Sequence, residues 1–119
     1  MEKQPKFCIA HIAMNTAGEA EARDITQLMQ TAFGISSQEG AKSYITGNVI
    51  EVIKGGYLGT NGHIAIGTPD IDAAVAYLEE KGLRFDPTTT EWDENGKKIV
   101  YLDHELAGFA LHLVRKELK

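Results

Sequence analysis

The sequence is poor in cysteine, in long apolar runs and in positive charge. Its 119 residues include one cysteine, Cys8, which excludes an internal disulfide and fits a reducing cytoplasm. No apolar run approaches the roughly 18 residues of a membrane span, and residues 1–6 are not followed by the apolar h-region of a signal peptide. We therefore expect no membrane association, no signal peptide and a cytoplasmic location. With 12 basic and 17 acidic residues the net charge is -5, which argues against nucleic-acid binding.

The sequence also lacks the short motifs of several enzyme classes. It has no P-loop, no dinucleotide-binding fingerprint and no Gly-x-Ser-x-Gly motif. What remains is ordinary for a globular protein, with 43% hydrophobic and 24% charged residues. The length fits one small domain, which we expect to span residues 1–119.

A short segment occurs twice and predicts the architecture. Ala10–Thr16 reads AHIAMNT and Gly62–Thr68 reads GHIAIGT, so the two share histidine, isoleucine, alanine and threonine at matched positions. Each is a β-like run that leads into a helical pattern. Such an internal repeat predicts two copies of one supersecondary unit.

Unit one, about residues 6–54, is predicted to be a βαββ unit. A strand over residues 7–14 has two largely apolar faces, which is typical of a central strand. A helix over 17–33 follows, with Thr16 and Glu19 as a capping box and Gly34 as its stop. After a turn at 36–40 we expect strands over 42–46 and 49–54, joined by the tight-turn dipeptide Gly47-Asn48.

Unit two, about residues 63–116, follows a glycine-rich linker at 55–62 and is predicted to be βαβββ. Thr68 is the expected N-cap of its helix, and Gly82 the expected end. Asn95-Gly96 predicts a hairpin. After the helix come the segments 83–85, 88–92 and 98–102, and the last strand is expected over 109–115. The whole is an α+β fold in which paired βαββ(β) units form a cupped mixed sheet.

Four residues share one property: each is a potential metal ligand in an otherwise apolar strand. Two lie in the first strand of a unit and two in the last; they are His11, Glu51, His63 and His112. A pseudo-twofold between the units would bring all four to the concave side of the sheet. Three imidazoles and a carboxylate suit Zn, Ni, Co, Mn or Fe(II) rather than Ca or Mg. With water in the shell the metal is a Lewis acid, whereas a closed tetrahedron indicates structural zinc.

Each of these residues also has a purely structural interpretation. A lone histidine in a strand is more often a satisfied core or edge residue, and Glu51 needs a partner that a lysine or a histidine pair also supplies. Trp92 and Tyr101 are expected to pack in the hairpin. Three further residues either line a pocket mouth or are simply solvated: Lys54, Tyr57 and Arg115.

Taken together, the two units resemble the vicinal oxygen chelate superfamily, the group of glyoxalase I, bleomycin resistance proteins and extradiol dioxygenases. The likeness covers nearly the whole chain and is strongest over 62–82 and 101–114. It implies metal ligands in the first and last strands of each unit, on the same four residues. His112 stands where the family carries a glutamate that glyoxalase I uses as a base, so glyoxalase I chemistry itself is not implied.

A narrower likeness concerns residues 57–68 and 108–113. They are similar to a C-terminal domain appended to some bacterial 2-keto-3-deoxy-6-phosphogluconate (KDPG) aldolases, which suggests sugar-acid catabolism. The aldolase barrel is absent from this sequence, so the likeness does not imply its Schiff-base lysine chemistry.

These features predict a divalent-metal-dependent lyase or isomerase that acts on a small oxygenated acid, such as a keto acid or sugar acid. Glu51 or a metal-bound water would move the proton. The alternative is a non-catalytic ligand-binding or auxiliary domain associated with KDPG aldolase metabolism. The family likeness also implies a homodimer as one arrangement, and the units can pair within a chain or between chains.

Overall fold

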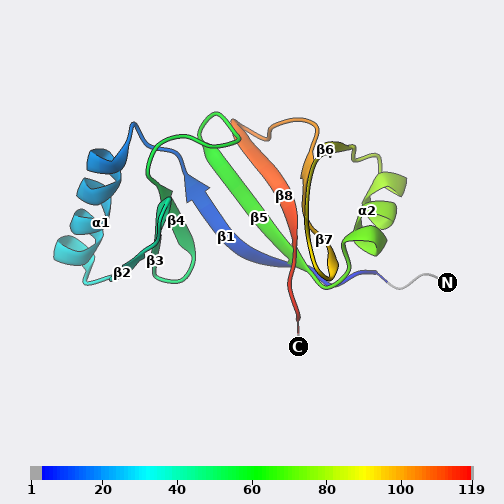
Figure 1. Ribbon diagram of the computed structural model, residues 1–119, viewed down its shortest axis with the longest axis horizontal. Coiled ribbons are helices and arrows are strands. Elements are labelled where there is room, and N and C mark those ends of the chain that lie inside the picture. The colour runs from blue at the N-terminus through cyan, green and yellow to red at the C-terminus, as the bar shows by residue number, and fades with distance from the viewer. Residues whose placement is uncertain (1–3, 119) are drawn as a thin grey trace.

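The structure, a computed structural model that describes residues 4–118, is a mixed sheet with two helices (Figure 1). Residues 1–3 and 119 of the predicted domain lie outside the described residues. The elements are β1 (Cys8–Met14), α1 (Glu19–Phe33), β2 (Ser37–Glu39), β3 (Ser43–Thr46), β4 (Ile50–Ile53), β5 (Gly62–Thr68), α2 (Ile71–Glu80), β6 (Phe85–Asp93), β7 (Gly96–Leu102) and β8 (Phe109–Arg115). The predicted α+β class is confirmed. Within the described part, no helix is both long and apolar enough to cross a membrane.

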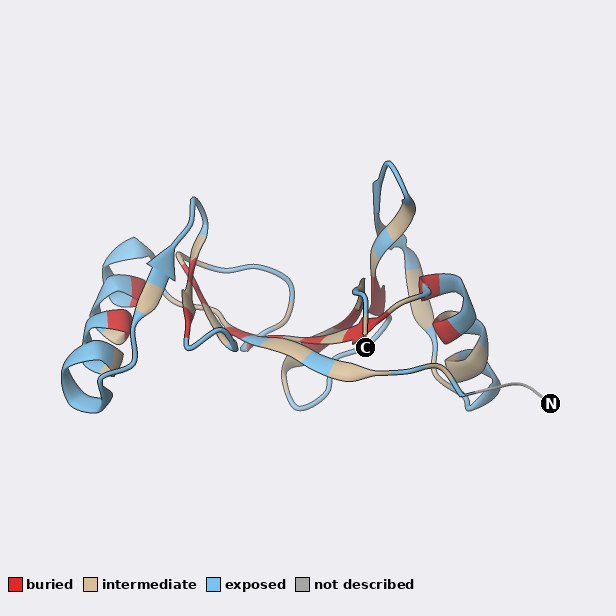
Figure 2. Ribbon diagram, turned by 90° about the horizontal axis from the view of Figure 1, so that it is seen from below, coloured by how far each residue is buried: buried red, intermediate tan, exposed pale blue. Residues whose placement is uncertain are grey.

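The eight strands form one sheet with the order β2-β3-β4-β1-β5-β8-β7-β6. The first strands of the two units, β1 and β5, pair antiparallel in the middle, and each has the last strand of its own unit as a parallel neighbour. The two units therefore pair within one chain, which the sequence left open. Seen from below, the middle strands form a floor and the outer strands rise on both sides of it (Figure 2).

Each helix covers the outer face of its own unit and closes a small hydrophobic core. Under α1 the core contains Ala22, Tyr44 and Val52. Under α2 it contains Ile71, Ala74, Val100 and Leu113. The apolar positions of alternate strand residues thus point toward the helices, and the opposite face of the floor is left for the polar residues of the same strands.

Several local predictions are confirmed. Gly34 ends α1 in the left-handed conformation, with φ of 68°, and its N–H donates to the Gln30 carbonyl. Gly47 and Asn48 both have positive φ, as a tight hairpin turn between β3 and β4 requires. A hairpin does join β6 to β7 at the Asn95-Gly96 signal.

The predicted number of strands in unit one is wrong. Ser37–Glu39, expected to be a turn, forms strand β2 against β3, so this unit is also βαβββ. The hydroxyls of Ser37 and Thr46 lie 2.7 Å apart across the pair. Tertiary pairing here overrides a turn-like composition. In unit two, residues 85–93 form the single strand β6, which contains the expected segment 88–92 and, of the expected segment 83–85, only Phe85.

Both predicted helix N-caps are also wrong. Gly18 precedes α1 without a side-chain cap, because the Thr16 hydroxyl donates instead to the Ile53 carbonyl at 2.6 Å. Thr68 is fully buried at the end of β5. Asp70 caps α2, and its carboxylate accepts a hydrogen bond from the Ala73 N–H at 3.1 Å.

Candidate metal centre

The four candidate ligands lie on four adjacent strands, β4, β1, β5 and β8, and the register of these strands brings them together. Ala13 pairs with Glu51 on one side and with His63 on the other. Ala65 pairs likewise with His11 and with His112. Paired residues point to the same face of a sheet, so all four functional side chains rise from one face. The small methyl groups between them leave room for the imidazoles.

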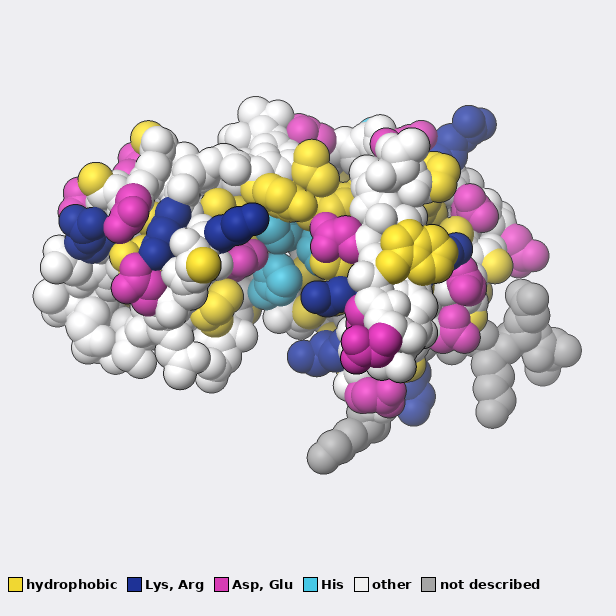
Figure 3. Space-filling view, viewed as in Figure 1, with side chains coloured by type: hydrophobic (Ala, Val, Ile, Leu, Met, Phe, Trp, Pro, Cys, Tyr) yellow, Lys and Arg dark blue, Asp and Glu magenta, His cyan; other side chains and the backbone are white. Residues whose placement is uncertain are grey.

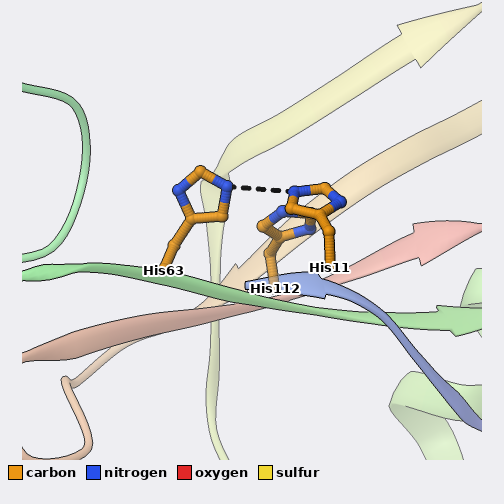
Figure 4. A group of neighbouring side chains, drawn as sticks. All are labelled: His11, His63 and His112. Carbon is orange, nitrogen blue, oxygen red and sulfur yellow. Dashed lines mark hydrogen bonds between the residues drawn. The ribbon is translucent and has the colours of Figure 1, made fainter. Parts of the chain in front are cut away.

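The ligand atoms of three of these residues are in mutual contact. The Nε2 atoms of His11 and His63 lie 3.2 Å apart, as the close-up shows (Figure 4). Glu51 Oε1 lies 3.5 Å from His11 Nε2 and 3.4 Å from His63 Nε2. His112 completes a group of three histidines, each of which offers one ring nitrogen within 4.8 Å of those of the other two.

Hydrogen bonds at the edge of the cluster orient the outer ligands. Ser43 donates its hydroxyl to Glu51 Oε2 at 2.8 Å. The Nδ1–H of His112 donates to the Leu113 carbonyl at 3.1 Å, which leaves Nε2 as the free nitrogen of the neutral ring. Nδ1 of His63 is buried and has no hydrogen-bond partner among the described residues.

The surroundings favour the charged form of the Glu51 carboxylate and the neutral forms of His11 and His112. The hydrogen bond from His63 lowers the pKa of Glu51 to about 2, against the opposing effect of burial. Burial lowers the pKa of His112 to about 4, and the neighbouring histidines lower it further. Burial also lowers the pKa of His11, although Glu51 opposes this. Deprotonated carboxylate and neutral imidazole are the forms that bind metal.

The donor set fits a divalent transition metal. Two atoms bound to one tetrahedral ion at about 2.0–2.2 Å lie about 3.3–3.6 Å from each other. The distances among His11 Nε2, His63 Nε2 and Glu51 Oε1, which are 3.2, 3.4 and 3.5 Å, are close to this range. Nitrogen-rich donors of this kind suit Zn, Ni, Co, Mn or Fe(II).

The cluster forms the floor of an open cleft of about 670 Å³ between the walls of the two units. The space-filling view shows histidine side chains at the bottom of this hollow, with basic side chains on either side (Figure 3). The cleft is lined by His11, Glu19, Ala41, Lys42, Ser43, Glu51, Ile53, Lys54, Gly56, Tyr57, His63, Glu91, Lys98, Ile99, Tyr101, His112 and Val114. The ligands are therefore accessible to a small molecule.

Some residues lie elsewhere than the sequence indicated. Tyr101, expected to pack in the hairpin, lines the cleft, with its ring centroid 4.8 Å from that of His112. Lys54 and Tyr57 do line the cleft. Arg115 lies outside it and binds the Asp93 carboxylate and the Lys97 carbonyl.

Sequence reasoning missed five polar residues of the cleft: Glu19, Lys42, Ser43, Glu91 and Lys98. Ser43 was within reach, because the Gly47-Asn48 turn sets the hairpin register that brings it near Glu51. Nothing in the sequence indicated that Lys98 faces the cleft, because its orientation depends on an irregularity of the hairpin that appears only in the structure.

The pKa values predict how acid affects the metal-free protein. His112 has an ordinary pKa of 6.5 and a folded pKa of about 4, so the unfolded chain binds an extra proton between these values. Stability should therefore fall as the pH is lowered from 6.5 to 4, by up to about 3 kcal/mol. Glu51, lowered from 4.5 to about 2, adds a further loss below pH 4.5.

Urea unfolding of metal-free protein between pH 7 and 4 measures this effect. In the His112→Gln variant, the free energy of unfolding should lose most of its dependence on pH above pH 4.5. His104→Gln, at an exposed position, should keep it. An identical slope in His112→Gln and the wild type would contradict the assignment to His112.

Solved structures share this fold at low sequence identity. No protein-family model matches the sequence, and no curated protein matches it. A methylmalonyl-CoA epimerase structure superposes with a TM-score of 0.68 at 17% identity, over 99% of this chain and 100% of that one. A hypothetical protein from Bacillus halodurans C-125 has a TM-score of 0.63 at 16% identity, over 96% of this chain and 97% of that one.

A variant of homoprotocatechuate 2,3-dioxygenase from Brevibacterium fuscum has a TM-score of 0.62 at 17% identity, over 97% of this chain and 34% of that one. The epimerase and the dioxygenase are both vicinal oxygen chelate proteins. This chain has the vicinal oxygen chelate fold. The resemblance seen in the sequence is thus confirmed at the level of the fold. The narrower likeness to the aldolase-associated domain stays a prediction.

Within the vicinal oxygen chelate fold, the structure places the four predicted ligands in the first and last strands of the units. His11 and His63 lie on β1 and β5, and Glu51 and His112 on β4 and β8. His112 is the most buried of the three histidines, with 2% of its surface exposed. A buried imidazole at this position can ligate a metal, but it cannot supply the carboxylate base that the family likeness would place there.

Proposed function

We propose that this protein is a divalent-metal-dependent enzyme that acts on a small oxygenated acid, as a lyase or isomerase. One observation carries the proposal. Three imidazoles and a carboxylate, with several ligand-atom distances near those of one coordination shell, form the floor of an open cleft. A closed structural site would not lie open to a space large enough for a small acid. The single cysteine fits a cytoplasmic location.

In this proposal His11, His63, His112 and Glu51 hold the metal. The bound ion supplies Lewis acidity that polarises an oxygen of the substrate. Polarisation of a carbonyl acidifies the neighbouring C–H, and an epimerase among the similar structures is in keeping with chemistry of this kind. Glu51 is the carboxylate nearest the site and is the proposed proton acceptor.

The low pKa of Glu51 creates a tension between its two proposed roles. A carboxylate with a pKa of about 2 is fully ionised at neutral pH and is a good ligand, but it is a weak base. Release of Oε2 from Ser43 would strengthen it as a base, because one of its stabilising hydrogen bonds would then be lost.

The proposal predicts hydrogen–deuterium exchange next to the carbonyl of a substrate acid. Protein loaded with Zn, Ni, Co or Mn is incubated in deuterium oxide with a panel of 2-keto acids and sugar acids, and loss of the C–H signal is followed by proton NMR. We expect at least one acid to exchange about 100-fold or more faster than with metal-free protein, the usual contribution of general-base catalysis.

Glu51→Gln is the matched variant for this experiment. Its amide oxygen can still face the metal but cannot accept the proton. We expect the variant to bind metal more weakly than the wild type and, when saturated with metal, to lose exchange by about 100-fold. Unchanged exchange would show that another group moves the proton, and no exchange of any acid by the wild type would contradict the enzymatic proposal.

A non-catalytic ligand-binding or auxiliary domain is the second candidate function. It is favoured by the imidazole of His112 at the position of the family's glutamate and by the weak basicity of Glu51. An association with KDPG aldolase metabolism belongs to this alternative. A metal-loaded protein that binds a keto acid or sugar acid without exchanging its protons would support it.

A further inference from the structure

Lys98 lies at an irregularity of the β6–β7 hairpin. Glu91 pairs with Ile99, and the next residue, Trp92, pairs with Lys97. One step along β6 therefore corresponds to two steps along β7, and Lys98 is the extra residue of a β-bulge. Bulges are frequent beside active sites, where they redirect a side chain.

The bulge changes which lysine faces the cleft. In β7, Ile99 and Tyr101 line the cleft, whereas Val100 is buried in the core under α2. In a regular strand, residue 97 would share the cleft face and residue 98 would point to the helix side. The structure has the reverse: the Lys97 ammonium binds Asp72 of α2 at 2.7 Å, and Lys98 lines the cleft.

The opposite wall carries a second lysine. Lys42 precedes β3 and also lines the cleft. Its carbonyl accepts a hydrogen bond from the Lys54 N–H at 2.9 Å, which fixes the backbone at this point. The two lysines thus belong to different units and border the same space.

Most other charged residues of the cleft already have partners. Glu51 is held by two histidines and Ser43, and Glu91 accepts a hydrogen bond from the Tyr57 hydroxyl at 3.5 Å. Glu19 pairs with Arg23 at 3.4 Å, and Lys54 pairs with Glu39 at 2.5 Å. Within residues 4–118, the structure shows no ion pair or side-chain hydrogen bond of Lys42 or Lys98. Among the charged cleft residues, the groups whose charge no oppositely charged side chain within residues 4–118 balances are the ammonium groups of Lys42 and Lys98 and the carboxylate of Glu91.

We propose that Lys98, with Lys42 across the cleft, binds a second carboxylate of the substrate, so that the substrate is a small dicarboxylic acid. This inference rests on the proposed function, in which the other end of the acid lies at the metal. The ring of Tyr101 packs on His112, and Lys98 lies three residues before Tyr101 on the same strand. The backbone positions of Lys98 and Tyr101 are therefore about 10 Å apart along the strand. The flexible stem of the lysine shortens that span, which suits an acid of about five carbons.

The experiment compares two five-carbon keto acids that differ only in the second carboxylate. Protein loaded with Co(II) is titrated with 2-oxoglutarate or 2-oxopentanoate, and binding is followed by the visible absorption of the cobalt. We expect the wild type to bind 2-oxoglutarate about 10-fold or more tightly than 2-oxopentanoate, the effect of one charge-assisted hydrogen bond.

Lys98→Met should lower the affinity for 2-oxoglutarate about 10-fold and leave that for 2-oxopentanoate unchanged. Lys97→Met is the matched control, because it removes a lysine from the same hairpin that faces α2. It should bind both acids as the wild type does. Lys98→Gln provides a second variant, and circular dichroism checks the fold of all three.

The outcomes separate this inference from the proposed function. Cobalt uptake with equal affinity for the two acids, or equal losses in the Lys97 and Lys98 variants, would overturn the inference and leave the metal site standing. Failure to take up cobalt, with Ni and Zn equally refused, would overturn both.

Discussion

Replacing His112 by alanine is expected to abolish tight metal binding. The purified wild type should take up about one transition metal ion per chain. His112 is 2% exposed and offers a free Nε2 toward His11 and His63, so its loss opens the shell on one side. Loss of a partner outside the shell already costs about 10–100-fold in affinity, and loss of a ligand should cost at least about 100-fold.

Elemental analysis and a competition titration with a chelating dye measure this loss. The matched control is His104→Ala, which removes the remaining histidine of the chain, an exposed residue that contacts Asp103. It should bind metal as the wild type does. An equal metal content in the two variants, or none in the wild type when Zn, Ni, Co, Mn and Fe(II) are offered, would contradict the site.

Gly62→Ala should destabilise the protein by about 3 kcal/mol or more. Gly62 has φ of 151°, and a Cβ there would lie 1.9 Å from the Ala13 carbonyl oxygen. It stands at the start of β5, where it pairs with Met14 of β1 and with Phe109 of β8. The clash is with backbone, so β1 and β5 must separate next to His63.

Gly56→Ala provides the control within the same linker. Gly56 has an ordinary φ, and no atom lies within 4 Å of a Cβ added there. The free energy of unfolding of this variant should therefore be within about 0.5 kcal/mol of that of the wild type. Urea unfolding followed by circular dichroism measures both. Because the clash moves His63, Gly62→Ala should also bind metal more weakly. Equal unfolding midpoints for the two variants would refute this account of Gly62.

The sequence by itself determined the ligand strands of the proposed site and the general fold. The repeat around His11 and His63 identified equivalent first strands, and strand alternation placed Glu51 and His112 on one face of their strands. Both inferences depend on local periodicity, which a strand keeps whatever its neighbours are. Glycine signals such as Gly34 were equally local, because a positive φ is a property of one residue.

Features that depend on contacts between distant segments were decided only by the tertiary structure. Ser37–Glu39 forms a strand because it pairs with β3. Thr16 does not cap α1 with its hydroxyl, because that hydroxyl donates to the Ile53 carbonyl. The contact of β1 with β5, across 52 residues of chain, pairs Ala13 with His63 and Ala65 with His11 and so joins the ligands of the two units. Lys98 faces the cleft through a bulge, which shifts register by one residue and thereby reverses the faces that alternation predicts.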